Sequence, residues 1–452
     1  MSTDQHLRPL RICIDARWNP HYTGGAGLVP VGLASGFSQL ADGDEEFYFL
    51  AYPGKDEHLR PCLRNRCRIL YCSEPVGPPP ESLWKRAARR VPGLQRAWRA
   101  SRRWRSVPSV PYVPADVPYS DGTVESAGMD LIHFPQQDGF LTALPSIYQP
   151  HDLQHLHFPE FFTAAEYAQR EKTYRTCCAQ SSMIAMMTHW GKRDLVQHYG
   201  IVEDKVCVVP GAPMISIYPS PRTEDLDVAR QRFALPNRFA FFPAQTWAHK
   251  NHMGLLDALA LLRNRDGLRV PLVCTGFQNS FFSRIREHVA KLGLDSQVQF
   301  LGFITPLELH CLYSLCSCLV FPSLFEGWGL PISEAFVAGT PVACSSLDPL
   351  VEQAGDAALF FDPHDAAQIA DAIRRLWLDI LLRDTLVARG KRRAPNFTWE
   401  RAARIFRSHY RRLTNRPLSE EDHLLIPHML HLPQNRRSIA DPPLSPQRDG
   451  LP

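Results

Sequence analysis

Residues 325–334 of this 452-residue chain read Phe325-Glu326-Gly327-Trp328-Gly329-Leu330-Pro331-Ile332-Ser333-Glu334. The apolar run at 318–322 is typical of a buried strand, and residues 335–339 predict a short helix ended by glycine. A glycine-rich turn before a helix N-terminus offers N–H groups to phosphate oxygens, and a carboxylate at each end can accept hydrogen bonds from hydroxyls. The stretch therefore indicates a site for a sugar joined to a diphosphate. A tight turn without a ligand is the alternative.

Composition limits the class of protein. The length predicts two or three domains, and 44% hydrophobic residues are ample for large cores. A net charge of only +4 implies no overall positive electrostatic field that would attract nucleic acid or an anionic membrane to the whole protein. The 12 cysteines contain no C-x-x-C pair, and several lie in apolar runs. With a polar stretch at Met1–Pro9 and no apolar run of about 20 residues, we expect a cytoplasmic protein.

Strand and helix signals alternate twice along the chain. The first series runs from Arg11–Asp15 to Val206–Gly211, and the second from Phe239 to about Arg393. Such alternation predicts α/β domains with doubly wound parallel sheets. We place a first domain at 1–215, with a Pro/Arg-rich insertion at about 75–120, and a second at 222–397. A helix at 398–415, capped by Thr398, and a disordered or loosely packed tail at 416–452 complete the prediction.

Further motifs follow in a consistent order: Phe242–His252, Val273–Gly276, Val298–Phe303, Gly339–Ala343 and Ala358–Pro363. With the Glu-x7-Glu pattern of Glu326 and Glu334, they resemble the retaining glycosyltransferases of family 4. The resemblance implies the GT-B architecture, in which two Rossmann-like domains face each other across a cleft and the last helix returns to the first domain. It also implies sugar transfer, with retention, from a nucleotide sugar to an acceptor hydroxyl, as in mannosyltransferase-like polysaccharide or glycolipid synthesis.

The resemblance also assigns roles to residues. Glu326 and His151 would face the transferred sugar as catalytic residues, Glu334 would hold the nucleotide ribose, and no metal or cofactor is expected. The donor-binding group would comprise Lys250, Gly327, Gly329, Leu330, Glu334 and Gly25. Many family members carry an arginine five or six residues before the lysine, where this chain has Gln245 and Ala244. The diphosphate would then depend on Lys250, main-chain amides or another basic group.

The histidines at 151, 155 and 157 have more than one interpretation. His151 and His155 are four residues apart, which suits a helical metal pair, but Pro150 disfavours a helix there. Sugar contact, structural packing and metal ligation by His151 all stay open, and His155 and His157 are read as surface or loop residues.

The insertion carries nine basic residues and no acid between 84 and 105, interleaved with tryptophans. This segment predicts peripheral contact with an anionic membrane or a lipid-linked acceptor. A solvated loop and nucleic-acid binding are the alternatives, and we expect no nucleic-acid partner. At the level of the whole chain, a nucleotide-sugar epimerase, a phosphorylase and a catalytically silent sugar-nucleotide scaffold remain the competing functions.

Overall fold

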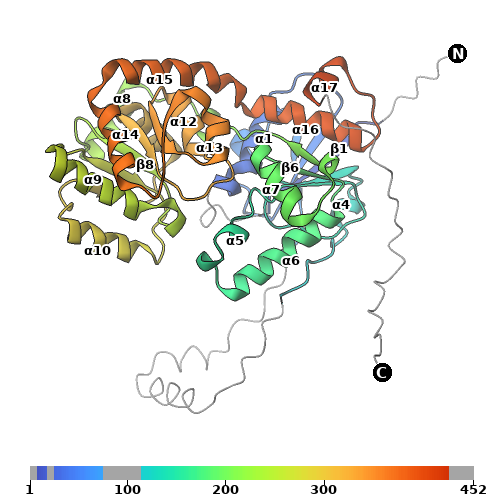
Figure 1. Cartoon of the computed structure of the whole chain (residues 1–452). Coiled ribbons are helices and arrows are strands. Elements are labelled where there is room, and N and C mark those ends of the chain that lie inside the picture. Colours follow the sequence, from blue (N-terminus) through green and yellow to red (C-terminus); the bar gives the residue numbers. More distant parts are fainter. Residues whose placement is uncertain (1–7, 18–24, 75–113, 427–452) are drawn as a thin grey trace, which may run out of the picture.

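A computed structural model describes residues 8–17, 25–74 and 114–426 and has two α/β domains side by side (Figure 1). The Pro/Arg-rich stretch 75–113, and with it the basic segment 84–105, lies outside the described residues. Among the described helices none is both long enough and apolar enough to cross a membrane.

The first domain is built on a seven-stranded, all-parallel sheet of order β3-β2-β1-β4-β5-β6-β7. Its strands are β1 (Arg11–Asp15), β2 (Glu46–Ala51), β3 (Cys67–Tyr71), β4 (Leu131–Phe134), β5 (Ser146–Tyr148), β6 (Met183–Met186) and β7 (Val206–Val208). Its helices are α1 (Val29–Ser38), α4 (Thr123–Ser126), α5 (Gln154–His157), α6 (Ala164–Gln180) and α7 (His189–Tyr199). Because helices cover both faces, the central strands are hydrophobic along their length and buried.

The second domain has a six-stranded parallel sheet of order β10-β9-β8-β11-β12-β13. The strands are β8 (Ala240–Pro243), β9 (Leu272–Thr275), β10 (Val298–Phe300), β11 (Cys318–Phe321), β12 (Val342–Ser345) and β13 (Ala358–Phe361). The helices are α8 (Thr223–Arg232), α9 (His252–Asp266), α10 (Phe282–Leu292), α11 (Pro306–Leu315), α12 (Leu330–Ala338), α13 (Asp348–Ala354), α14 (Ala366–Leu378) and α15 (Ile380–Arg393). One continuous apolar core fills this domain. The predicted class, two doubly wound Rossmann-like domains, is confirmed.

The helix α16 (Trp399–Leu413) follows the second domain in sequence but packs on α1 of the first (Figure 1). A Cβ at Gly32 or Gly36 would lie 2.2 Å from Trp399, so these glycines allow the close approach of the two helices. The Trp399 indole donates to the Pro213 carbonyl over 3.1 Å. The returning helix α16 therefore holds the start of the interdomain linker at Pro213.

The prediction of a loosely packed tail at 416–452 is wrong for its described part. Residues 420–425 form α17 (Glu420–Leu425), which begins with a capping box between Ser419 and Asp422. Arg411 of α16 donates to Asp422 over 2.8 Å and to Glu45 over 2.5 Å. Charge-assisted hydrogen bonds hold this segment, together with Leu425 and Ile426, which pack against the core of the first domain. Residues 427–452 lie outside the description.

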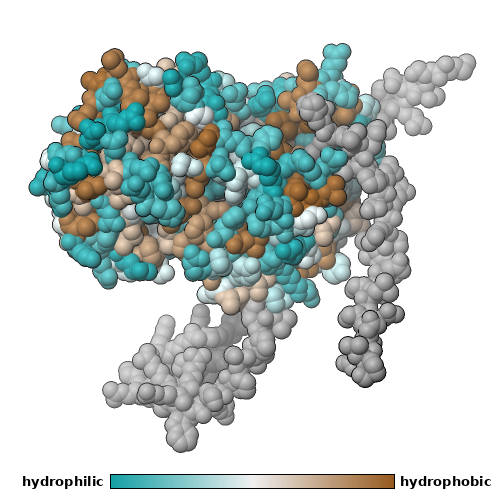
Figure 2. All heavy atoms as spheres, viewed as in Figure 1, coloured by the Kyte–Doolittle hydropathy of each residue, from teal (hydrophilic) through white to brown (hydrophobic). Residues whose placement is uncertain are grey.

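One corner of the second domain is unusually apolar. Leu378, Ile380 and Leu381, at the junction of α14 and α15, are 60%, 61% and 79% exposed. Figure 2 shows hydrophobic residues gathered at the corner where α8, α14 and α15 lie in Figure 1. This corner provides a comparison surface for any test of membrane contact by the basic segment.

Candidate active site

The carboxyl ends of the central strands of the second sheet carry the predicted donor residues. The turn from β11 to α12 holds Glu326, and the loop after β8 ends in the short 3-10 helix η6 (Ala248–Lys250). The Leu324 N–H donates to the His249 carbonyl over 2.7 Å, which joins the two loops. The Asn251 amide donates to the carbonyls of Pro322 and Pro363 over 3.1 and 2.8 Å and fixes the lysine loop in place.

Lys250 and Glu326 form an ion pair across this junction. The ammonium nitrogen lies 2.5 Å from Glu326 Oε1, and the side chains are 19% and 11% exposed. The sequence placed both residues at a donor site but did not predict their direct contact. The pair thus holds together an ammonium group that can bind a diphosphate and a carboxylate that can accept hydrogen bonds from a sugar.

Gly329 has a φ of 95°, which favours glycine, and a Cβ there would lie 2.6 Å from Leu350 Cδ2. Leu330 begins α12, and Pro331 takes a first-turn position, where its missing N–H costs no hydrogen bond. The helix thus presents its N-terminal amides beside the Lys250–Glu326 pair. This is the arrangement expected of an anion-binding turn.

Glu334, in contrast, is not open to a ligand in the structure. It is 5% exposed and accepts a hydrogen bond from the Tyr313 hydroxyl over 2.7 Å. Burial raises the pKa of Glu334, while hydrogen bonds from Tyr313 and from the N–H groups of Met214 and Ile215 oppose that shift. The predicted ribose contact stays a prediction, and it requires Glu334 to exchange these protein partners for the ribose.

His151 and Gly25 of the first domain contact the turn between β11 and α12. A Cβ at Gly327 would lie 2.7 Å from the His151 carbonyl oxygen, and one at Gly25 would lie 2.6 Å from Leu330 Cδ1. His151 has a φ of 69° in a γ-turn closed by the Asp152 N–H and the Pro150 carbonyl at 2.9 Å. The structure therefore gathers His151, Gly25, Gly327 and Leu330 where the two domains meet.

The His151 imidazole is turned into the protein. It is 6% exposed, and its Nε2 lies 3.0 Å from the Pro135 carbonyl oxygen. Burial lowers the pKa of His151, so the ring is neutral near pH 7 with its Nε2 proton donated to Pro135. Nothing in this geometry tests the predicted sugar contact.

Of the two remaining histidines, His155 corrects the sequence interpretation and His157 agrees with it. His155 is fully buried, and its Nε2 lies 3.0 Å from Glu171 Oε1 rather than near a metal partner at His151. His157 lies 2.9 Å from Asp194 Oδ1, on α7. His155 is therefore not the surface residue that the sequence predicted, because α6 covers it, whereas His157 lies at the surface as predicted.

Trp328 fixes the turn on the first domain. Its ring is 5% exposed, belongs to the core of the first domain, and packs edge-to-face on Phe397 with a centroid distance of 5.2 Å. A Cβ at Gly211 would lie 2.9 Å from the indole. The Glu352 carboxylate adds a second tie by accepting from the N–H groups of His189 and Trp190, at the start of α7.

Arg170 of α6 is a basic residue that the sequence interpretation missed. Its Nη2 donates to Gln137 over 2.8 Å, whereas Nη1 is buried without a partner among the described residues. The positive charge of Arg170 contributes to lowering the pKa of both His151 and His249. Gln245, where many family members have arginine, instead accepts a hydrogen bond from the Trp247 indole over 2.6 Å. No local motif distinguishes Arg170 from an ordinary solvated arginine.

Arg170 also lines a hollow of about 450 Å³ on the first domain. The remaining walls include Gln137, Asp138, Phe162, Gln169 and Tyr174. Aromatic rings, amides, a carboxylate and a guanidinium together can bind a polyhydroxylated molecule.

Residues 225–393 match the family described as Glycosyl transferases group 1. The chain is 28% identical over 266 residues to the O-antigen chain mannosyltransferase B of Escherichia coli, covering 57% of this chain and 70% of the relative. It is 32% identical over 237 residues to a D-inositol 3-phosphate glycosyltransferase of Salinispora arenicola, covering 49% of this chain and 53% of the relative.

The fold agrees with these sequence matches. The structure of sucrose-phosphate synthase from Thermosynechococcus elongatus superposes with a TM-score of 0.64 at 19% identity, covering 90% of this chain and 99% of that one. Residues 225–393 are similar to the group 1 glycosyltransferase domain, and the two domains together have the GT-B fold. The narrower assignment to the retaining family 4 stays a prediction.

Proposed function

We propose that this chain transfers a sugar, with retention of its anomeric configuration, from a nucleotide-diphosphate-sugar to a hydroxyl of a carbohydrate or lipid-linked acceptor. The observation that carries the proposal is the Lys250–Glu326 pair beside the N-terminus of α12. The mannosyltransferase named among the relatives favours a mannosyl donor and polysaccharide or glycolipid synthesis.

The donor diphosphate takes over Lys250 in this proposal. The ammonium moves from Glu326 to the phosphate oxygens, and the main-chain amides at Gly329 and Leu330 supply further donors. Stabilising the departing diphosphate is the main electrostatic task, which these groups perform without a metal. Because Lys250 leaves it, Glu326 becomes free to accept hydrogen bonds from the sugar and to stabilise positive charge on the sugar ring.

The acceptor enters from the first domain. We place it in the hollow beside Arg170, with its reacting hydroxyl directed toward the turn where His151 meets Gly327. The bond between the anomeric carbon and the phosphate oxygen breaks, and a bond from that carbon to the acceptor oxygen forms. The hydroxyl proton passes to the leaving diphosphate, so no separate protein base is required.

A panel of nucleotide sugars tests the proposal, with and without oligosaccharide acceptors, by detecting released nucleoside diphosphate and glycosidic product. Acceptor-dependent product supports transfer. Sugar isomerisation without acceptor indicates an epimerase, product formation from a sugar phosphate indicates a phosphorylase, and donor binding without turnover indicates a silent scaffold.

A further inference from the structure

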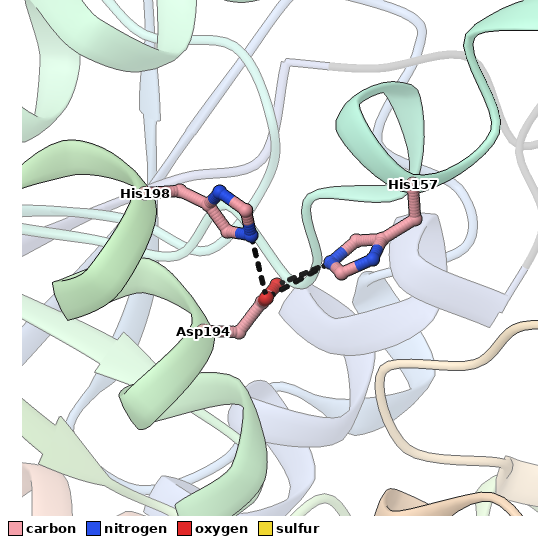
Figure 3. A group of neighbouring side chains, drawn as sticks. All are labelled: His157, Asp194 and His198. Atoms are coloured by element: carbon pink, nitrogen blue, oxygen red, sulfur yellow. Dashed lines mark hydrogen bonds and ion pairs between the residues drawn. The ribbon is translucent and has the colours of Figure 1, made fainter.

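Three side chains with metal-binding atoms converge beside the domain junction, and none of them belongs to the proposed donor-binding group. His157 comes from α5, whereas Asp194 and His198 lie one turn apart on α7 (Figure 3). His157 Nε2 lies 2.9 and 3.0 Å from the two Asp194 oxygens, and His198 Nε2 lies 3.3 Å from Oδ1. One ligand atom from each residue can be chosen so that all lie within 4.8 Å of one another.

These distances suit a transition metal. Zinc–ligand bonds of about 2.0–2.1 Å place the ligand atoms of a tetrahedral site about 3.3 Å apart. The His157–Asp194 separations of 2.9 and 3.0 Å and the His198–Asp194 separation of 3.3 Å are close to that value. Two imidazoles and a carboxylate are a donor set that zinc prefers, and a water would complete the tetrahedron. Asp194 is 8% exposed, whereas the histidines are 29% and 35% exposed, so an ion can enter from the histidine side.

The cysteine thiols, which would compete for a transition metal, are largely inaccessible to solvent. Eleven of the 12 cysteines are buried, and Cys316 is half-buried. Burial raises the pKa of each thiol, which disfavours the thiolate that zinc binds. Within the described residues, His157, Asp194 and His198 are the one group of three or more His, Cys, Asp or Glu side chains with metal-binding separations.

The cluster touches the turn that carries Glu326. The Phe325 ring packs on His157 and on Trp190, with centroid distances of 5.1 and 5.9 Å. Trp190 lies in the first turn of the helix that carries Asp194 and His198, and Glu352 of the second domain accepts a hydrogen bond from its N–H group over 3.1 Å. An ion that joins α5 to α7 therefore fixes the two elements on which Phe325 rests.

We propose that His157, Asp194 and His198 bind one divalent transition-metal ion of the zinc class, which joins α5 to α7 and stabilises the docking of Phe325. The ion is separate from the proposed sugar transfer, because Lys250 and the α12 amides serve the donor diphosphate. The alternative is a metal-free cluster in which both imidazoles donate Nε2 protons to Asp194.

The test uses the full-length, tag-free protein, stripped with EDTA and dialysed, and titrated with Zn²⁺ in a calorimeter. We expect one ion per chain and a melting temperature that rises with added Zn²⁺. Co²⁺ in place of Zn²⁺ should give the visible absorption of a four-coordinate site.

Two variants separate metal binding from hydrogen bonding. Asp194→Asn keeps an acceptor for both imidazoles but removes the charged ligand, and His198→Ala removes a ligand at the exposed edge. Each should weaken Zn²⁺ binding by at least ~10- to 100-fold, the loss seen when even the partners of metal ligands are removed. His364→Ala, at an exposed position outside the cluster, is the matched control and should bind as wild type.

The metal-free melting temperature of each variant reports whether it folds. Should a variant not fold, His157→Gln with Co²⁺ absorption provides a second reading of the same site. Absence of one-to-one Zn²⁺ binding by the wild type overturns the proposal. Binding that persists unchanged in folded Asp194→Asn and His198→Ala also overturns it.

Discussion

Replacing Lys250 with methionine separates the two partners of the central ion pair. If the ammonium serves the diphosphate, Lys250→Met should weaken nucleoside-diphosphate binding by about 1.5–3 kcal/mol, the range for a hydrogen bond to a charged group. At 1.4 kcal/mol per tenfold, that is roughly 12- to 140-fold in Kd. Methionine keeps much of the apolar stem, so packing on Phe321, whose ring centroid lies 5.7 Å from the ammonium, is largely retained.

The partner variant Glu326→Gln should act in the opposite direction. In the free protein Glu326 neutralises Lys250 at 2.5 Å, so a diphosphate must first displace the carboxylate. Removing that charge should tighten nucleoside-diphosphate binding by about 0.5–1 kcal/mol, or roughly two- to fivefold, since the pair keeps some contact with water.

Isothermal titration with a nucleoside diphosphate that lacks the sugar measures both effects, because Glu326 then has no sugar hydroxyl to contact. Unchanged affinity in Lys250→Met would remove this residue from the donor site. Equal weakening by both variants would mean that the pair is a structural unit rather than a competitor of the ligand. The double variant should resemble Lys250→Met alone.

Four further outcomes follow from the structure. Glu326→Ala should lower turnover by ~10²–10³-fold, as for other lost transition-state contacts, with little change in melting temperature; parallel collapse of both would indicate a structural role. Transfer activity should survive EDTA, even if removal of a metal from the cluster of His157, Asp194 and His198 lowers the melting temperature. If EDTA abolishes sugar transfer and Mg²⁺ or Mn²⁺ restores it, the assignment of Lys250 to the diphosphate is contradicted. Neutralising the arginines of 84–105 should abolish salt-sensitive binding to anionic vesicles, whereas polar substitutions at the α14–α15 corner should leave that binding unchanged. If the wild-type protein does not co-sediment with anionic vesicles at low salt, membrane contact is refuted. Burial lowers the pKa of His133, which is hydrogen-bonded to Tyr410 and Gln149, to about 3. The neutral ring therefore stabilises the fold above about pH 6.5, and this contribution is lost as pH falls toward 3. His133→Gln should reduce the pH dependence of stability in acid-unfolding curves, and an unchanged slope would contradict this account.

The two-domain architecture could be predicted because its signals are local. Fully buried parallel strands such as Cys318–Phe321 are apolar along their length, and the glycine turn after that strand has a distinctive order of residues. The sequence also placed Lys250 and Glu326 at the carboxyl edge of one sheet, although they are 76 residues apart. Parallel topology brings such loops together without any pairing signal in the sequence.

Contacts between distant elements could not be predicted in the same way. Glu334 is buried by the segment at Met214 and Ile215, and no pattern around Glu334 indicates that cover. His157 reaches Asp194 only because a four-residue helix, α5, is held against α7. Arg170 lines the hollow on the first domain with residues distant in sequence, which amphipathic spacing along α6 does not encode. Each of these contacts depends on the tertiary structure and could not be predicted from the local sequence.

The most direct test of sugar transfer at this site is the anomeric configuration of the product, followed by NMR during the reaction. A nucleotide sugar of mannose, with α configuration, should give an α-linked product with an oligosaccharide acceptor, and Glu326→Ala should form that product at a greatly reduced rate. A β-linked product would contradict retention. Nucleoside-diphosphate release without any glycosidic product, or an unaffected Glu326→Ala variant, would contradict sugar transfer at the Lys250–Glu326 pair.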